Sequence, residues 1–329
     1  MTDEIKIRDI TPSDEYALGE LYDSVWPETA GTKQGKTKWM LSSSSFYGVC
    51  ATANGKVIGS RPSFYSNIYY GDRQIKAVQC GNSCVHSDFR RYGIFSKMNS
   101  VFLDKFFIDN QNDLIYNVSV YASKMAYQKM GWVYIDTLSK LTYIANFWNV
   151  FWKTKLNPKK LAGNVIYKKN AIPNLFDFDY KLLETRENYF RRTANLHTYY
   201  DKDFFRWRMN SDSDIAILQI ENLGAVVYKI GVRKRLNVVT IGEIFLYKYN
   251  KQNLRRIIST VKKQFKIDLL EVSITEQHPC CQTYKKLGFI TNPFKKYLSL
   301  GVKVVSDEMK QTCLNPKNWA LAGIDIDTF

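Results

Sequence analysis

The chain has 329 residues, of which 45% are hydrophobic, so it is long enough for about two domains with separate cores. Its formal net charge of +16 predicts an anionic partner, and nucleic acid, an acidic membrane surface or a phosphorylated small molecule would each satisfy it. No apolar run approaches the about 18 residues of a membrane span, and the six cysteines and three histidines lack zinc-type spacing, so we expect a cytoplasmic protein with buried free thiols and no metal site.

The N-terminal part of the chain reads as a strand, two helices and a hairpin. Residues 5–10 alternate apolar and polar side chains, as a half-buried strand does. Further on, the strand-like runs Phe46 to Thr52 and Lys56 to Tyr65 flank Asn54-Gly55. This dipeptide between two such runs is a strong hairpin signal, because both residues tolerate a positive φ.

A basic turn with a single glycine follows the strand Gln74 to Val85. The turn holds Arg90, Arg91 and Gly93, and leads into a helix whose apolar residues recur at three- and four-residue steps: Phe95, Met98, Phe102 and Phe106. The first N–H groups of a helix lack partners within it, and the helix dipole puts partial positive charge there. The pattern therefore predicts an anion site at this turn.

A second strand and helix come next. Residues 114–120 alternate, with Asn117 and Ser119 on the polar face, where their side chains could hydrogen-bond an amide-containing ligand. The helix from Ser123 to Met130 stops at Gly131, and Trp132 to Ile144 reads as a long strand or a hairpin.

The order of these elements, together with two short motifs, resembles the GNAT superfamily of acyl-CoA-dependent N-acyltransferases. In that family the turn reads Gln/Arg-x-x-Gly-x-Gly/Ala, and the later helix ends in Tyr-x-x-x-Gly-Phe/Trp. Arg90, Gly93, Tyr127 and Gly131 match, whereas Phe95 stands where a small residue is expected. The resemblance implies an α/β (α+β) fold, with a mixed, mainly antiparallel sheet flanked by helices, and acyl-CoA as co-substrate.

The resemblance also implies roles for individual residues. Backbone N–H groups from Arg91 to Ser96 would hold the coenzyme A pyrophosphate, the strand ending at Val85 would pair with the pantetheine, and Tyr127 would protonate the departing thiolate. A tyrosine, with an ordinary pKa near 10, suits a thiol leaving group of comparable acidity. The candidate coenzyme-binding residues are Val85, Arg90, Arg91, Tyr92, Gly93, Ile94, Phe95, Ser96 and Asn117.

The general base is harder to assign. The strand before the turn offers Gln79, Asn82, Ser83 and Cys84 but no carboxylate, so we expect the amine to lose its proton through ordered water or to a residue from elsewhere. His86 has a suitable pKa range, but histidine often occupies this loop entrance in the family without a chemical role.

Residues 146–178 are expected to form a basic, aromatic linker. No acidic residue occurs between Asp136 and Phe176, and an aromatic cluster opens the segment: Phe147, Trp148, Phe151 and Trp152. A nucleic-acid reader could be built this way. Because Pro158, Gly163 and Pro173 interrupt the segment, a linker whose short helix docks its aromatic face between domains is the preferred interpretation.

The second half repeats the first. Tyr284 to Phe289 copies Tyr127 to Trp132 at an offset of 157 residues, as 284 − 127 and 288 − 131 both give. Upstream, residues 214–220, 225–232 and 237–246 predict strands, and residues 253–265 predict a helix. No glycine occurs between Ile244 and Arg256, so this copy lacks the phosphate turn.

We therefore expect tandem GNAT-like domains. Residues 1–145 would carry the coenzyme A site, 179–301 would form a degenerate second domain, and 302–329 would pack on the body. Asp325 or Asp327 in that last segment could reach an acceptor amine, although a tail packed on the second domain is the simpler interpretation. A monomer acting as a pseudo-dimer is expected.

The expected activity is transfer of an acetyl or somewhat larger acyl group to an amine. The resemblance favours a dTDP- or UDP-linked deoxy-amino sugar of surface polysaccharide synthesis, for lipopolysaccharide or capsule, with no nucleic-acid or membrane partner. The alternatives are a protein or peptide amine as acceptor, or a basic adaptor that binds nucleic acid without turnover.

Overall fold

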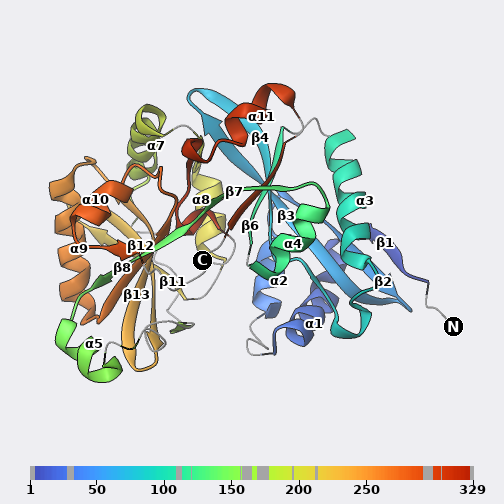
Figure 1. Ribbon diagram of the computed structural model, residues 1–329, viewed down its shortest axis with the longest axis horizontal. Helices are drawn as coiled ribbons and strands as arrows, with labels where there is room; N and C mark the ends of the chain where they lie inside the picture. The colour runs from blue at the N-terminus through green and yellow to red at the C-terminus, as the bar shows by residue number, and fades with distance from the viewer. Residues whose placement is uncertain are drawn as a thin grey trace. The chain divides into compact units, whose positions relative to one another are not determined.

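The computed structural model describes residues 4–27, 33–108, 113–119, 121–155, 157, 165–168, 178–194, 196–211, 214–291, 299–304 and 306–326. The chain divides into two compact units, each with its own sheet flanked by helices (Figure 1). The first unit comprises residues 1–68, 74–135 and 300–314, and the second comprises residues 69–73, 136–299 and 315–329. The predicted tandem α/β architecture is confirmed.

In the first unit the strand order is β1-β2-β3-β4-β6-β16-β7, and β5 pairs with β3. The strands are β1 (Lys6–Asp9), β2 (Phe46–Ala53), β3 (Lys56–Tyr70), β4 (Arg73–Cys80), β5 (Cys84–Val85), β6 (Leu114–Ser119), β7 (Val133–Thr137) and β16 (Ser299–Val304). The helices are α1 (Glu15–Val25), α2 (Lys33–Leu41), α3 (Ile94–Ile108), α4 (Tyr121–Lys129) and α11 (Asp307–Cys313). The predicted hairpin is present, since β2 and β3 pair antiparallel across Asn54 and Gly55, both at positive φ.

Helix α3 is fixed by its apolar face. Met98, Phe102 and Phe106 are fully buried in the core of this unit, together with sheet residues such as Val49 and Val78. Each fully buried side chain of this size contributes about 1.5–3 kcal/mol. This packing holds the N-terminus of α3 at the end of the basic turn, as the sequence predicts.

The sheet of the second unit has the strand order β11-β12-β13-β14-β8-β15, with β9 paired to β12. Strands β10 and β17 of this unit pair in parallel with each other outside that sheet. Its strands are β8 (Ser139–Ile144), β9 (Ile166–Tyr167), β10 (Leu196–Thr198), β11 (Ile215–Ile220), β12 (Gly224–Arg233), β13 (Leu236–Leu246), β14 (Leu269–Ile274), β15 (Ile290–Thr291) and β17 (Trp319–Ala320). Its helices are α5 (Phe147–Thr154), α7 (Lys181–Thr193), α8 (Lys202–Met209), α9 (Lys251–Phe265) and α10 (Cys281–Lys286). The three strands and the helix predicted upstream of Tyr284 are confirmed.

Strands β8 and β16 each belong to a different unit from the one that their position in the sequence suggests. Strand β8 lies between β14 and β15 in the second sheet, where it appears green among orange strands in Figure 1, and β16 lies between β6 and β7 in the first. Residues 132–144 are therefore neither one strand nor a hairpin. The two units also differ from the domains expected from the sequence, whose boundaries were residues 145 and 302. A buried ion pair from Lys140 Nζ on β8 to Glu271 on β14, 2.6 Å long, anchors this exchange.

The aromatic helix of the predicted linker is α5, and its packing differs from the expectation. Val150 is buried in a core cluster with Leu236, Val238 and Leu269, and Thr154, one turn further along the helix, is buried as well. The rings of Phe147, Trp148 and Trp152 are instead 50%, 69% and 72% exposed. Of the rest of the predicted linker, residues 156, 158–164 and 169–177 lie outside the described residues.

Candidate functional site

The basic turn of the first unit adopts a left-handed backbone at two places. Arg91 and Gly93 both have φ of 71°, and a Cβ on Gly93 would meet nothing within 4 Å. The glycine is therefore needed for its backbone conformation, not because of crowding. Arg90 folds back, and its Nε donates to the Val85 carbonyl oxygen at 3.2 Å.

The turn leaves the N-terminus of α3 open. The first bond of the helical ladder runs from Lys97 N–H to the Gly93 oxygen at 2.9 Å, so the N–H groups of residues 94–96 precede it. Arg90, Arg91, Tyr92 and Ser96 are exposed around this end, whereas Ile94 is buried. Backbone donors, the helix dipole and two arginines thus converge where the sequence predicts a phosphate.

Phe95, which departs from the family pattern, does not occupy this end of the helix. Its ring turns inward and packs edge-on against Tyr127, with centroids 5.3 Å apart. The bulky side chain thus connects the turn to Tyr127 and leaves the backbone donors accessible.

The sheet opens next to the turn. Strands β4 and β6 run parallel, and their pairing ends at Cys80 and Asn117. The chain then bends through Asn82, at φ of 48°, and continues as β5, which pairs with β3 among the described strands. Val85 therefore lies on a strand that has separated from β6.

Tyr127 lies on α4, is 4% exposed and is enclosed by aromatic rings. Its ring centroid is 4.8 Å from that of Trp132. Its hydroxyl accepts a hydrogen bond of 2.8 Å from Nη1 of Arg61. In the described part of the chain, no group accepts the Tyr127 hydroxyl proton.

Arg61, a residue that the sequence analysis did not single out, is the buried cation of this site. It is 0% exposed, and its guanidinium also donates to Ser83 Oγ at 3.2 Å and to Cys80 Sγ at 3.5 Å. Burial disfavours its charge, but Cys80 and Tyr127 keep the pKa of Arg61 raised. Aromatic rings surround it, with centroids 4.8–5.8 Å away: Phe95, Phe102, Tyr127 and Trp132. The sequence feature that could have pointed to Arg61 is that it is the single charged residue in the run Val57 to Phe64.

Of the other candidate residues, His86 has a structural partner, whereas Asn117 has a buried side-chain oxygen without one among the described residues. His86 Nδ1 accepts from the Asp88 N–H at 3.4 Å, so the ring caps its own turn. Asn117 is 2% exposed, its Oδ1 lacks a hydrogen-bond partner among the described residues, and a Cβ on Gly301 of β16 would come within 2.6 Å of it. The six cysteines are buried free thiols, as predicted.

The C-terminal carboxylate that the structure describes, Asp325, has its partners within the second unit. Asp325 belongs to the second unit, where it is buried and accepts hydrogen bonds from the Tyr200 hydroxyl and the Ala322 N–H. Burial raises its pKa. Asp325 thus acts as a packed structural acid, which matches the simpler interpretation of the tail, and Asp327 lies outside the described residues.

The second unit repeats the geometry of the Tyr127 signature. Gly131 and Gly288 both have positive φ, of 79° and 95°, and the N–H groups of Trp132 and Phe289 each bond the tyrosine carbonyl at 3.1 Å. Helices α3 and α9 also share the 157-residue offset, since 251 − 94 and 265 − 108 both give 157.

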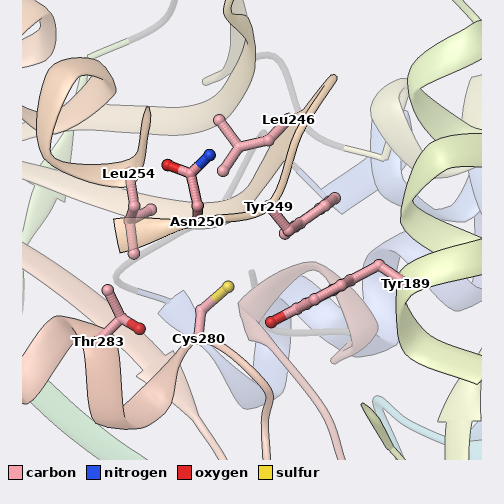
Figure 2. Close-up of a pocket in the computed structure, with 7 residues that line it drawn as sticks. All are labelled: Tyr189, Leu246, Tyr249, Asn250, Leu254, Cys280 and Thr283. Atoms are coloured by element: carbon pink, nitrogen blue, oxygen red, sulfur yellow. The ribbon is translucent and has the colours of Figure 1, made fainter. Parts of the chain in front are cut away.

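At this offset Asn250 stands in the place of Gly93. Its side chain accepts from the Asn253 N–H at 2.8 Å and so caps α9, occupying one of the helix-end donors. Tyr249 stacks on Tyr189 with centroids 4.3 Å apart. A small pocket remains, and Figure 2 shows its lining side chains: Tyr189, Leu246, Tyr249, Asn250, Leu254, Cys280 and Thr283.

The described residues contain neither a metal-binding cluster nor a membrane-spanning helix. No three His, Cys, Asp or Glu side chains within them gather as a metal ion would require. None of the helices they form is long and apolar enough to cross a membrane.

No protein-family model matches the sequence, and no curated protein matches it. Solved structures do match. A GCN5-related N-acetyltransferase from Kribbella flavida has a TM-score of 0.63 at 13% identity, covering 92% of this chain and 71% of that one. One from Anabaena variabilis has a TM-score of 0.66 at 8% identity, with coverage of 92% and 73%. A conserved Enterococcus faecalis protein of unknown function, a probable N-acyltransferase, has a TM-score of 0.65 at 10% identity, with the same coverage. The chain thus has the fold of the GCN5-related N-acetyltransferases.

Proposed function

We propose that the chain is an acyl-CoA-dependent N-acyltransferase with one coenzyme A site, in the first unit. The observation that carries the proposal is the open N-terminus of α3 beside Arg90 and Arg91, joined through Phe95 to the buried hydroxyl of Tyr127. A helix end with flanking arginines suits a pyrophosphate, and a hydroxyl with its proton available suits a leaving thiolate.

The coenzyme-binding residues in this proposal are those of the turn and the separated strand. The pyrophosphate would bind the N–H groups of residues 91–96, and the pantetheine would pair with β5 at Val85, where β4 and β6 have parted. Asn117 offers an unpartnered amide oxygen to a pantetheine N–H. The donor acyl group is acetyl or a somewhat larger chain.

The reaction is a direct attack on the thioester. The neutral amine forms the C–N bond, the C–S bond breaks with its electron pair on sulfur, and Tyr127 gives that sulfur its proton. The proton on the attacking nitrogen leaves to ordered water, because His86 is engaged in its own turn. General acid catalysis of this kind contributes about 10²- to 10⁴-fold to the rate.

For the acceptor we propose the amino group of a dTDP- or UDP-linked deoxy-amino sugar. Both substrates would then be polyanions, which agrees with the net charge of +16. We assign acceptor selection to the segment between Trp26 and Trp39 and to the second unit; residues 28–32 of that segment lie outside the described residues. The protein would act in surface polysaccharide synthesis as a monomer.

The test is thiol release from acetyl-CoA and longer acyl-CoAs against a panel of nucleotide-linked amino sugars, peptides and protein amines. We expect release that depends on an amino sugar and is lost in the Arg90→Ala/Arg91→Ala variant. Release only with peptide or protein amines would reassign the acceptor. Coenzyme A binding without release for any amine, together with salt-sensitive nucleic-acid binding, would replace the enzyme by an adaptor.

A further inference from the structure

Arg61 is a buried cation whose hydrogen-bond partners in the described part of the chain carry no acidic group. Among the described residues, no carboxylate oxygen lies within 4.0 Å of its guanidinium, whose hydrogen bonds go to neutral groups and whose Nε has none. Two buried arginines of the second unit differ, since Arg186 lies 3.2 Å from Glu243 and Arg233 lies 2.6 Å from Glu271. An uncompensated buried charge is costly, so a compensating negative charge is expected at some stage of function.

The hydrogen bond to Tyr127 shows where that charge would form. Arg61 Nη1 donates to Tyr127 Oη at 2.8 Å, which occupies a lone pair of the hydroxyl and leaves its proton directed elsewhere. The aromatic rings around both groups exclude water, which strengthens the attraction between opposite charges.

We propose that Arg61 is a positioning residue for Tyr127, stabilising the tyrosinate that forms when Tyr127 protonates the leaving thiolate. This inference rests on the proposed acyl transfer. As the C–S bond breaks, sulfur keeps the electron pair and takes the Tyr127 proton, so the thiol leaves neutral and the negative charge lies on Tyr127 beside Arg61. The proton released from the attacking amine to water then restores the hydroxyl.

A double-mutant cycle tests this coupling. We expect Arg61→Met to lower kcat about 30-fold with little change in KM for acyl-CoA, and to have almost no further effect in a Tyr127→Phe background. Arg61→Lys, which keeps the charge, should retain more activity than Arg61→Met. The exposed Arg255→Met is the matched control and should behave as wild type.

A change of leaving group gives the second readout. An aryl thioester, whose thiol is acidic enough to leave without a proton, should be turned over by Arg61→Met nearly as fast as by wild type. A purely structural role would slow both donors equally. If Arg61→Met does not fold, as its melting curve would show, Arg61→Lys takes its place in the cycle.

The outcomes separate the two proposals. Two results would overturn the role of Arg61 while leaving acyl transfer in place. In the first, Arg61→Met lowers kcat by the same factor in the wild-type and the Tyr127→Phe backgrounds. In the second, it lowers kcat by the same factor with acyl-CoA and with the aryl thioester. No thiol release by the wild-type protein with any acyl-CoA and amine would overturn the proposed function, and this inference with it.

Discussion

Tyr127 and Tyr284 occupy the same place in two copies of one backbone pattern, but their electrostatic surroundings have opposite sign. Tyr127 accepts a hydrogen bond from the buried cation of Arg61. Around Tyr284, burial together with Cys280 and Glu243 raises the pKa well above its usual value near 10. Glu243 is itself held ionised, because His278 and Arg186 outweigh burial and lower its pKa.

The two copies of the motif therefore share their packing but differ in the charges around the tyrosine hydroxyl. Both tyrosines pack on the aromatic residue that ends the motif, at 4.8 Å for Trp132 and 5.0 Å for Phe289. A cation favours the phenolate that a proton donor leaves behind, whereas an anion opposes it. We therefore assign the working hydroxyl to the first unit.

Removing each hydroxyl is the strongest challenge to this assignment. We expect Tyr127→Phe to lower kcat about 10²- to 10³-fold with little change in coenzyme binding, and Tyr284→Phe to leave kcat near wild type. Steady-state thiol release measures both. Comparable losses in the two variants would remove the distinction between the units.

The ion pairs of the second unit should contribute to stability instead. Although burial opposes ionisation, Arg233 and Lys140 lower the pKa of Glu271 to about 2, below the about 4.3 of an unfolded chain. Glu271→Gln should cost about 3 kcal/mol at pH 7, because it removes the carboxylate that faces the buried guanidinium of Arg233 and the half-buried ammonium of Lys140.

The sign of the pH dependence follows from this lowered pKa. The carboxylate stabilises the fold above about pH 4.3, and that contribution is lost as the pH falls toward 2. Urea unfolding at several pH values should therefore show the deficit of Glu271→Gln shrinking below pH 4. A deficit independent of pH would contradict the ion-pair account.

The position of β16 in the first sheet can be tested by a substitution at Gly301. A Cβ at Gly301 of β16 would lie 2.6 Å from Asn117 Oδ1 and 2.9 Å from the Tyr134 ring. Gly301→Ala should therefore destabilise the protein by about 1–3 kcal/mol in denaturant unfolding. An unchanged midpoint would argue against β16 lying beside β6.

The smallest expected effect comes from making one turn resemble the other. Gly93→Asn would place the residue type of position 250 at the corresponding point of the first unit, although at φ of 71° instead of −156°. Asparagine tolerates a positive φ, and its amide would compete with phosphate near the helix-end donors. We expect KM for acyl-CoA to rise about tenfold, which corresponds to about 1.4 kcal/mol, with kcat little changed. A KM unaffected by Gly93→Asn would show that the donors of α3 do not hold the coenzyme.

Local signals in the sequence predict much of this fold. The Asn54-Gly55 hairpin, the buried face of α3 and the 157-residue repeat each depend on a short pattern, and each is confirmed. The exchange of β8 and β16 could not be predicted this way, because an alternating strand has the same pattern whichever sheet it joins.

The same distinction between local patterns and long-range contacts applies to the candidate site. The turn and Tyr127 follow from motifs, whereas Arg61 comes from a strand and meets Tyr127 across 66 residues of sequence. Its contacts with Ser83 and Cys80 exist only once the sheet has formed. The aromatic residues of α5 led to a wrong expectation for a related reason, because the buried face of this helix is formed by Val150 and Thr154.

The central claim is that one chain has one coenzyme site, at the turn of the first unit. Titration calorimetry with coenzyme A measures this directly, using the wild type, Gly93→Asn and Arg90→Ala/Arg91→Ala. The account predicts one coenzyme A per chain, weakened in the first variant and lost in the second. Two molecules per chain, or binding that neither variant changes, would contradict it.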